Sequence, residues 1–160
     1  MKSNVRGRKL DEVDKKILSI LIENSRTSIR EIARELRLSP ATIHERIKKL
    51  IERNVIRAFT ILLDHRLIGY DVTALILMSV DGKHIVEVEE WLSRQRGVVA
   101  VYDITGEFDV AVIVKTRNIS ELNEFVKNTL QNPYIKRTVT SVVFNVVKED
   151  FRLPIVEFEG

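Results

Sequence analysis

The sequence contains no cysteine. This absence excludes disulfide bonds, thiolate zinc sites and cysteine nucleophiles, and it fits a reducing compartment. Long apolar runs are also missing, because a run such as Thr73–Val80 is far shorter than the ~18–20 residues of a membrane-spanning helix. The N-terminal residues are basic but no apolar segment follows them, so we expect no signal peptide. From these absences we expect a cytoplasmic protein that does not bind or span a membrane.

Motifs for catalysis and cofactor binding are absent as well. The sequence has no nucleophile elbow, no Walker loop and no dinucleotide fingerprint. His65 and His84 have no second histidine or cysteine at the spacing of metal ligands. We therefore expect no metal, no cofactor and no enzymatic activity. A small enzyme is the alternative that the predicted fold alone does not exclude.

Charge is distributed unevenly along the chain. The net charge is +3, but residues 1–70 hold 16 basic and 9 acidic side chains, whereas residues 71–160 hold 10 and 14. A basic half beside an acidic half indicates that only the first half meets a polyanion such as nucleic acid. Chance segregation of solvated charge is the alternative. The apolar content of 44% and the charged content of 31% are typical of a globular protein.

Three amphipathic helices are predicted in the basic half. Ser28 and Glu31 form a capping box that opens the second helix. Ser39 is a good N-cap for the third helix, and Pro40 occupies its first position, where a missing N–H costs nothing. We expect helices over residues 11–24 and 28–36 and from residue 40 to before residue 54, followed by a short strand or wing over Val55–Leu63.

The third predicted helix has the features of a DNA recognition helix. Short polar and basic side chains occupy its first turns and the face opposite its apolar stripe, as the DNA major groove requires. The alternative is an ordinary surface helix, or a winged helix that contacts proteins. With Ser39 at the helix start, the candidates for contacts with base edges are Ala41, Thr42, His44 and Glu45. The candidates for phosphate contacts are Arg46, Lys48, Lys49 and Arg57.

The second half alternates between strands and helices. Its order is βαβ followed by βαβ, which is that of the ferredoxin-like α+β fold, an antiparallel sheet with two helices on one face. Apolar residues on both sides of the strands imply that the other face is covered too, most simply by the sheet of a second copy. The predicted strands are 72–80, 98–105, 110–116 and 135–148, and the predicted helices are 85–96 and 120–131.

The connection Gly106–Asp109 in the middle of this half is a candidate ligand site. Glycine lets the backbone turn sharply and exposes N–H groups, and the carboxylates of Glu107 and Asp109 could bind the ammonium group of a zwitterion such as an amino acid. The alternative is a plain hairpin turn. Thr138 and Thr140 on the last predicted strand could add hydrogen bonds, although threonine in a strand often only fits the pleated surface.

A family resemblance covers about residues 8–150. It rests on the motifs Leu10-Asp11-x-x-Asp14-x-x-Ile17-Leu18, Leu38-Ser39-Pro40, Arg46-Ile47-x-x-Leu50, Val55-Ile56 and Gly106-x-x-Asp109. With these motifs, the first half closely resembles the N-terminal domain of the leucine-responsive/asparagine (Lrp/AsnC) regulators, and the second half resembles their regulatory domain.

The resemblance implies a transcriptional regulator that binds pseudo-palindromic sites in double-stranded DNA. It also implies a homodimer formed through the C-terminal sheets, which often assembles into tetramers, octamers or larger discs. A small effector, usually an amino acid, would bind near the middle turn at interfaces between dimers. The effector positions that carry over are Gly106, Glu107, Phe108 and Asp109, with Thr138 and Thr140 as weaker transfers.

From these patterns we expect two domains. Residues 1–69 would form a winged helix-turn-helix DNA-binding domain with a flexible basic N-terminal arm and a linker strand. Residues 70–160 would form a ferredoxin-like effector-binding and oligomerisation domain with a C-terminal tail. Arg37 stands where the family usually has glycine, and a positive φ there would cost about 1 kcal/mol. A second function stays open, namely a metabolite-binding module that regulates an enzyme by direct contact.

Overall fold

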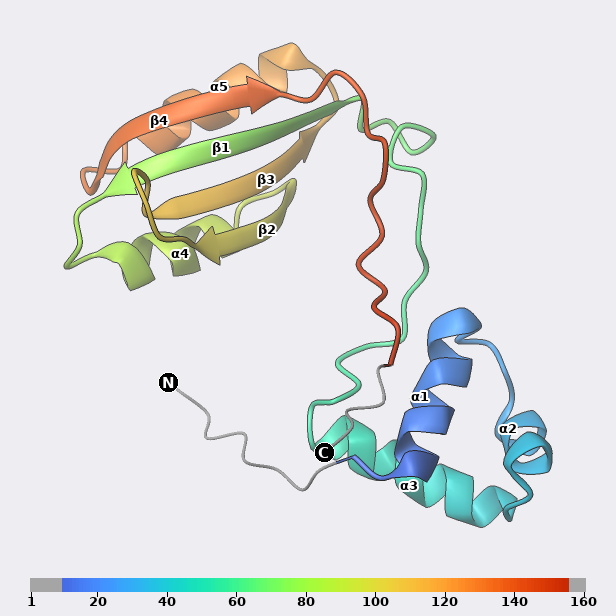
Figure 1. The fold of residues 1–160 in the computed structure, drawn as a ribbon. Coiled ribbons are helices and arrows are strands. Elements are labelled where there is room, and N and C mark those ends of the chain that lie inside the picture. Colours follow the sequence, from blue (N-terminus) through green and yellow to red (C-terminus); the bar gives the residue numbers. More distant parts are fainter. Residues whose placement is uncertain (1–9, 156–160) are drawn as a thin grey trace. The chain divides into compact units, whose positions relative to one another are not determined.

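A computed structural model describes residues 10–155 and divides the chain into two compact units. We call them the helical unit, residues 10–62 with 150–155, and the sheet unit, residues 63–149. Figure 1 shows the elements of each. The predicted N-terminal arm lies outside the described residues. Within them, no helix is long and apolar enough to cross a membrane.

The helical unit contains the three predicted helices, and local capping sets where they begin. Asp11 accepts a hydrogen bond from the Asp14 backbone N–H at 2.8 Å and caps the first helix. Ser28 and Glu31 form the predicted capping box, each side chain bonding the other residue's backbone N–H. Arg37 follows the second helix as its C-cap with φ = 55°, so the condition under which a residue other than glycine is costly there is met. The helices are α1 Glu12–Glu23, α2 Ile29–Leu36 and α3 Pro40–Glu52.

The core of the helical unit is a small cluster of aliphatic side chains. Each of the three helices contributes one buried stripe to it, as their amphipathic spacing predicted. Ile155, from the segment that follows the sheet unit in the sequence, packs against the same cluster. The fully buried members, at 0–1% exposure, are Ile17, Ile32, Ile43 and Leu50.

The strand predicted over Val55–Leu63 is wrong, because this segment has no regular structure. Its branched residues favour an extended backbone, but a strand forms only where a neighbouring strand supplies hydrogen-bond partners. Within the described chain no strand pairs with it. Its apolar side chains remain exposed, with Phe59 at 52% and Ile61 at 71%.

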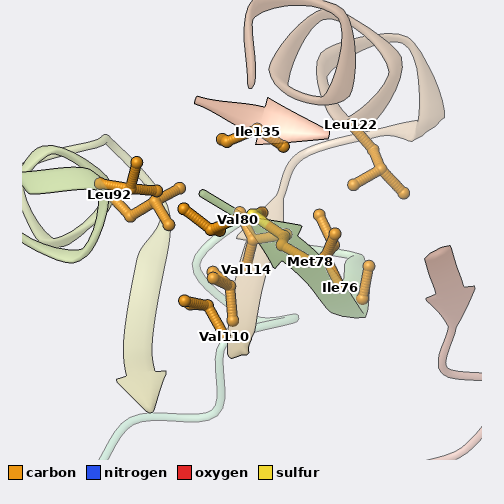
Figure 2. Packing of buried hydrophobic residues seen from close by; sticks show 11 residues of the cluster. Ile76, Met78, Val80, Leu92, Val110, Val114, Leu122 and Ile135 are labelled. Atoms are coloured by element: carbon orange, nitrogen blue, oxygen red, sulfur yellow. The ribbon is translucent and has the colours of Figure 1, made fainter. Parts of the chain in front are cut away.

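The sheet unit is a four-stranded antiparallel sheet in the order β2-β3-β1-β4, with both helices packed on one face. Figure 2 shows how Leu92 of α4 and Leu122 of α5 point toward the buried side chains of β1 and β3. This is the predicted ferredoxin-like arrangement. The elements are β1 Val72–Val80, α4 Ile85–Ser93, β2 Val98–Asp103, β3 Val110–Thr116, α5 Ile119–Leu130 and β4 Ile135–Val142.

The last strand ends at Val142 and not at Lys148, as the sequence had predicted. The apolar run continues past this point, but its pairing partner does not. Ala74 pairs with Val142 and the Thr73 carbonyl accepts the Val143 N–H at 2.9 Å, close to where β1 begins. The length of β1 therefore sets the end of β4.

The face of the sheet away from the helices is apolar and open in the single chain. On β1, Ile76 is fully buried beneath the helices, whereas Leu75 on the opposite face is 37% exposed. Tyr102 on β2 is 45% exposed. Apolar side chains thus occupy both faces, as expected from the sequence, and the partner sheet that would cover the second face stays a prediction.

Candidate DNA and ligand sites

The start of α3 is built by local hydrogen bonds. The Ser39 hydroxyl accepts the Thr42 backbone N–H at 3.0 Å and lies 2.8 Å from the Thr42 hydroxyl. Pro40 follows at the first helical position. Because Arg37 turns the chain with a positive φ two residues before this cap, α2 and α3 are joined by a tight turn, as in a helix-turn-helix.

The predicted base-contacting side chains lie on the exposed surface of α3. Ile43 and Leu50 hold the opposite side of the helix in the core, at 0% and 1% exposure. An exposed helix face anchored in this way can enter a major groove without disturbing the fold. The side chains that α3 exposes to solvent include Ala41, Thr42, His44, Glu45, Lys48 and Lys49.

Arg46 differs from the other predicted phosphate contacts because its guanidinium is already engaged. One nitrogen lies 2.7 Å from the Asp11 carboxylate and 2.8 Å from that of Asp14. These hydrogen bonds raise the pKa of Arg46. The pKa of Asp11 is lowered, because its carboxylate accepts hydrogen bonds from the Arg46 guanidinium and from the Asp14 backbone N–H. Sequence reasoning missed this use of Arg46, although Asp11 and Asp14 stand three residues apart on one helical face.

Arg57 lies beyond α3, in the segment that forms no strand, and its side chain is exposed. Lys48, Lys49 and Arg57 thus present cations to solvent from the helical unit. Their role as phosphate contacts stays a prediction. Over the described residues, no group of three or more acidic, histidine or cysteine side chains is arranged to hold a metal ion.

In the sheet unit, the turn Gly106–Asp109 joins the end of β2 to the start of β3. Gly106 has φ = +125°, a conformation that side-chain-bearing residues rarely adopt. One Asp109 carboxylate oxygen accepts the Val80 backbone N–H at 2.8 Å and lies 3.4 Å from the Ser79 hydroxyl. These bonds fall where the register of β1 with β4 shifts, so the Asp109 carboxylate supports the end of β1.

The rest of this turn meets Arg137 of β4, a residue that the sequence did not single out. Its guanidinium lies 3.1 Å from the Glu107 carboxylate and 5.3 Å from the centre of the Phe108 ring. Thr138 and Thr140 pair with Met78 and Ile76 of β1. Directly paired residues share a face, so both threonines lie on the helix-covered side and Arg137 on the open side.

A buried lysine connects three segments of the sheet unit. Lys115 of β3 is 4% exposed, and its ammonium lies 2.7 Å from the Glu149 carboxylate and 3.3 Å from the Thr73 hydroxyl. The same Glu149 oxygen lies 3.7 Å from His65. Glu149 thus holds the segment before β1 and the segment after β4 against the end of β3. No local signal in the sequence marks this cluster.

Comparison with known families gives a match for each unit. Residues 10–57 match the model of the winged helix-turn-helix DNA-binding domain. Residues 73–153 match the model of the Lrp/AsnC ligand binding domain.

Relatives over nearly the whole chain are regulators of the same kind. An uncharacterised HTH-type transcriptional regulator of Pyrococcus horikoshii is 49% identical over 144 residues, which cover 90% of this chain and 97% of that protein. The HTH-type transcriptional regulator FL11 of the same organism is 40% identical and covers 91% and 97% of the two chains. The families and relatives are transcription regulators and not enzymes.

Solved structures with the same fold include Escherichia coli AsnC, with a TM-score of 0.80, 28% identity and coverage of 89% of this chain and 97% of that one. A transcriptional regulator from Neisseria meningitidis, solved in complex with L-Met, has a TM-score of 0.81, 26% identity and coverage of 92% and 97%.

Proposed function

Since the chain belongs to the Lrp/AsnC family of transcriptional regulators, with a helix-turn-helix DNA-binding domain and a ligand-binding domain, we propose that it reads specific operators through α3 and responds to an amino acid. The observation that supports the DNA part is the exposed face of α3, whose first turn is capped by Ser39. Ala41 and the Thr42 methyl group are suited to thymine methyl groups, and Glu45 to a cytosine amine. Lys48 and Lys49 are suited to phosphates, which fix register without reading sequence.

We further propose that two copies bind one pseudo-palindromic site. The open apolar face of the sheet, with Leu75 and Tyr102 partly exposed, supports a sheet-to-sheet dimer. Two-fold symmetry would then present two α3 helices to successive major grooves, about 34 Å apart along the duplex. Further assembly into tetramers or octamers is part of this proposal.

The effector part of the proposal places an amino acid at the turn Gly106–Asp109. Gly106 is open to solvent, with nothing within 4 Å of where a Cβ would lie, and this supports access for a ligand. Glu107 and Arg137 offer one carboxylate and one guanidinium beside it. The N. meningitidis relative was solved with L-Met, which supports the same ligand class here. Binding would act by favouring one assembly or head spacing over another, which requires different affinities for the two states.

DNA binding is tested by fluorescence anisotropy on the purified protein and the DNA upstream of its own gene, with excess nonspecific competitor. We expect tight, competitor-resistant binding that falls by orders of magnitude between about 50 and 200 mM salt. Lys49→Ala should weaken binding to all sequences and lower the salt slope by about one, whereas Thr42→Ala should alter sequence preference.

The matched control is Lys127→Ala, an exposed lysine in the last turn of α5 in the sheet unit. It should leave both the affinity and the salt slope unchanged. The proposal that the protein binds specific operators would be wrong if the wild-type protein bound the DNA upstream of its own gene, and other candidate operators, no more tightly than random DNA. Salt-insensitive binding to a protein partner would favour direct regulation of an enzyme.

The effector part is tested separately, by measuring assembly size and DNA affinity in saturating L-Met and then in other L-amino acids. Glu107→Gln and Arg137→Ala should weaken the response without altering DNA affinity in the absence of ligand. If saturating amino acids change neither assembly size nor DNA affinity, the effector mechanism is wrong while the DNA-binding part stands.

A further inference from the structure

The sheet unit has a pocket at the end of the sheet opposite the turn Gly106–Asp109. It has a volume of about 210 Å³ and lies where β2 begins and β3 ends, beside one face of α5. This is below the ~300–1,000 Å³ of sites for drug-sized ligands, so it suits a smaller molecule. Six of its lining residues matter for its chemistry: Tyr70, Arg96, Arg117, Glu121, Glu124 and Phe125.

The backbone around Gly97 fixes the rim of this pocket. Gly97 has φ = +82°, and a Cβ there would lie only 2.4 Å from the Lys115 carbonyl oxygen. The Lys115 N–H in turn donates to the Gly97 carbonyl at 2.8 Å. The turn between α4 and β2 therefore lies directly on the end of β3, and Arg96, which precedes Gly97, is held at the pocket.

Two of the cations that line the pocket are already neutralised. Arg117 donates to Glu121 through its backbone N–H at 2.7 Å and its Nε at 2.6 Å, and these bonds lower the pKa of the Glu121 carboxyl. The Lys115 ammonium is bound to Glu149 at 2.7 Å. Both groups therefore already have a carboxylate partner within the protein.

Arg96 and Glu124 are different. Within residues 10–155, neither side chain has an oppositely charged group within 4.0 Å, and the Arg96 charge reaches the Glu121 carboxyl only from beyond that distance. Both are exposed, and both line the same small pocket. A pure anion would be repelled by Glu124 and a pure cation by Arg96, whereas a molecule that carries both charges satisfies both.

We propose that this pocket binds a small zwitterion, with its carboxylate on Arg96 and its ammonium on Glu124. The guanidinium offers a fork of N–H donors that matches a carboxylate, and these charge-assisted hydrogen bonds are the strong ones. The rings of Phe125 and Tyr70 supply an apolar surface for the rest of the molecule. This site is separate from the turn Gly106–Asp109 and does not depend on an effector binding there.

The test is calorimetric titration of the full-length protein with the twenty L-amino acids one at a time, followed by the methyl ester and the N-acetyl derivative of the tightest binder. The ester lacks the carboxylate and the acetyl derivative lacks the ammonium. The variants are Arg96→Ala and Glu124→Gln. The matched control is Arg94→Ala, an exposed arginine two residues from Arg96 that pairs with Glu90 and does not line the pocket.

Arg96→Ala and Glu124→Gln should each weaken binding by about tenfold or more, and Arg94→Ala should not. The wild-type protein should prefer the amino acid to both derivatives. Arg96→Ala should lose the preference over the ester, and Glu124→Gln the preference over the acetyl derivative. This double readout separates ligand contact from a change in folding. If Arg96→Ala does not fold, Arg96→Lys carries the test, with retained but weaker carboxylate binding.

Unchanged binding in the Arg96 and Glu124 variants would overturn the pocket proposal. If Glu107→Gln and Arg137→Ala are the variants that weaken binding, the amino acid binds at the turn alone and the effector proposal survives without the pocket. If no amino acid binds the wild-type protein, both ligand proposals fail, whereas operator binding is unaffected. If the wild-type titration shows two binding steps, and the pocket variants weaken one step and the turn variants the other, the protein has two amino-acid sites.

Discussion

The two units of this chain hold their polar side chains in different ways. In the helical unit most of the hydrogen bonds from side chains join residues two or three positions apart, as in the capping box of Ser28 and Glu31. The helices and turns of the sheet unit have local bonds of the same kind, but this unit also has several bonds between distant segments. Asp109 accepts from Val80, 29 positions away, and Lys115 donates to Thr73, 42 positions away. Local bonds form within a single helix, whereas distant ones require the whole sheet to close. We therefore expect the two units to respond separately to mutation.

The largest effect is expected from the core of the helical unit. Ile43→Ala removes a fully buried side chain and should lower the free energy of unfolding of this unit by about 2–5 kcal/mol. Trp91, the only tryptophan, packs against the core of the sheet unit, so its fluorescence reports that unit alone. We expect the circular-dichroism transition, which reports the helices of both units, to shift in part, while the Trp91 transition stays in place.

The matched control for Ile43→Ala is Val112→Ala, which truncates a fully buried side chain of the sheet unit. It should move the Trp91 transition and leave operator binding at low temperature intact. If both variants shift both transitions together, the chain unfolds as one cooperative body and the comparison between the units breaks down.

Arg46 is the exception to local bonding in the helical unit, and its removal comes next in size. Arg46→Ala leaves the Asp14 carboxylate, whose side chain is only 12% exposed, without its guanidinium partner. We expect a loss of about 2 kcal/mol of helical-unit stability. The salt slope of DNA binding should stay unchanged in this variant, since Arg46 holds Asp11 and Asp14, whereas Lys49→Ala lowers it. If Arg46→Ala lowered the salt slope of DNA binding, Arg46 would contact a DNA phosphate as well.

The same pair predicts a pH dependence. Because the pKa of Asp11 is lowered in the folded protein, its contribution to stability is present above the ordinary aspartate pKa of about 4 and is lost as the pH falls through the lowered value. The stability difference between the wild-type protein and Arg46→Ala should therefore shrink in acid, which denaturant unfolding at pH 7 and below pH 4 would measure.

In the sheet unit, Asp109→Asn tests the support that the turn gives to β1. It removes the charge from the hydrogen bond to the Val80 N–H and should lower stability by about 1 kcal/mol, seen in the Trp91 transition. Glu107→Gln is the matched control, because the Glu107–Arg137 pair is exposed and such pairs contribute little. Equal losses in the two variants would mean that the turn is stabilised as a unit rather than through Asp109.

The smallest effect is expected at Glu89 of α4, where one carboxylate oxygen is buried without a hydrogen-bond partner among the described residues. Burial and the charge of Asp103 raise the pKa of Glu89. The folded protein therefore binds this proton more strongly, and the stability it contributes in acid is lost as the pH rises through the raised pKa. Glu89→Gln should raise the free energy of unfolding of the sheet unit by about 0.5 kcal/mol at pH 7, measured through the Trp91 transition, and should give no gain near pH 4.

The difference between the units also explains which features the sequence predicts. The helix starts were predictable because each cap acts within three residues, Ser28 with Glu31 and Ser39 with Pro40 and Thr42. The strand over Val55–Leu63 was not, because branched residues favour an extended chain but do not supply a neighbour. Likewise, β4 stops at Val142 since β1 begins nearby, which is a property of another segment.

The same reasoning applies to the sites. The exposed side chains of α3 could be named in advance, because helical spacing alone separates them from Ile43 and Leu50. Arg137 could not, because only the register of β4 against β1 brings it to a turn 30 residues away. Arg96 and Glu124 line one pocket because a turn packs on a strand end, which no local motif encodes.

Residues 150–155 belong with the helical unit although they follow the sheet unit in the sequence. A recombinant fragment that stops at residue 62 would therefore lack Ile155, which packs against the helical core. A single cut in the chain therefore cannot separate the two units, because the helical unit consists of two segments. A helical fragment for crystallography or binding assays needs residues 150–155 rejoined through a designed loop, and a sheet fragment is best cloned as residues 63–149.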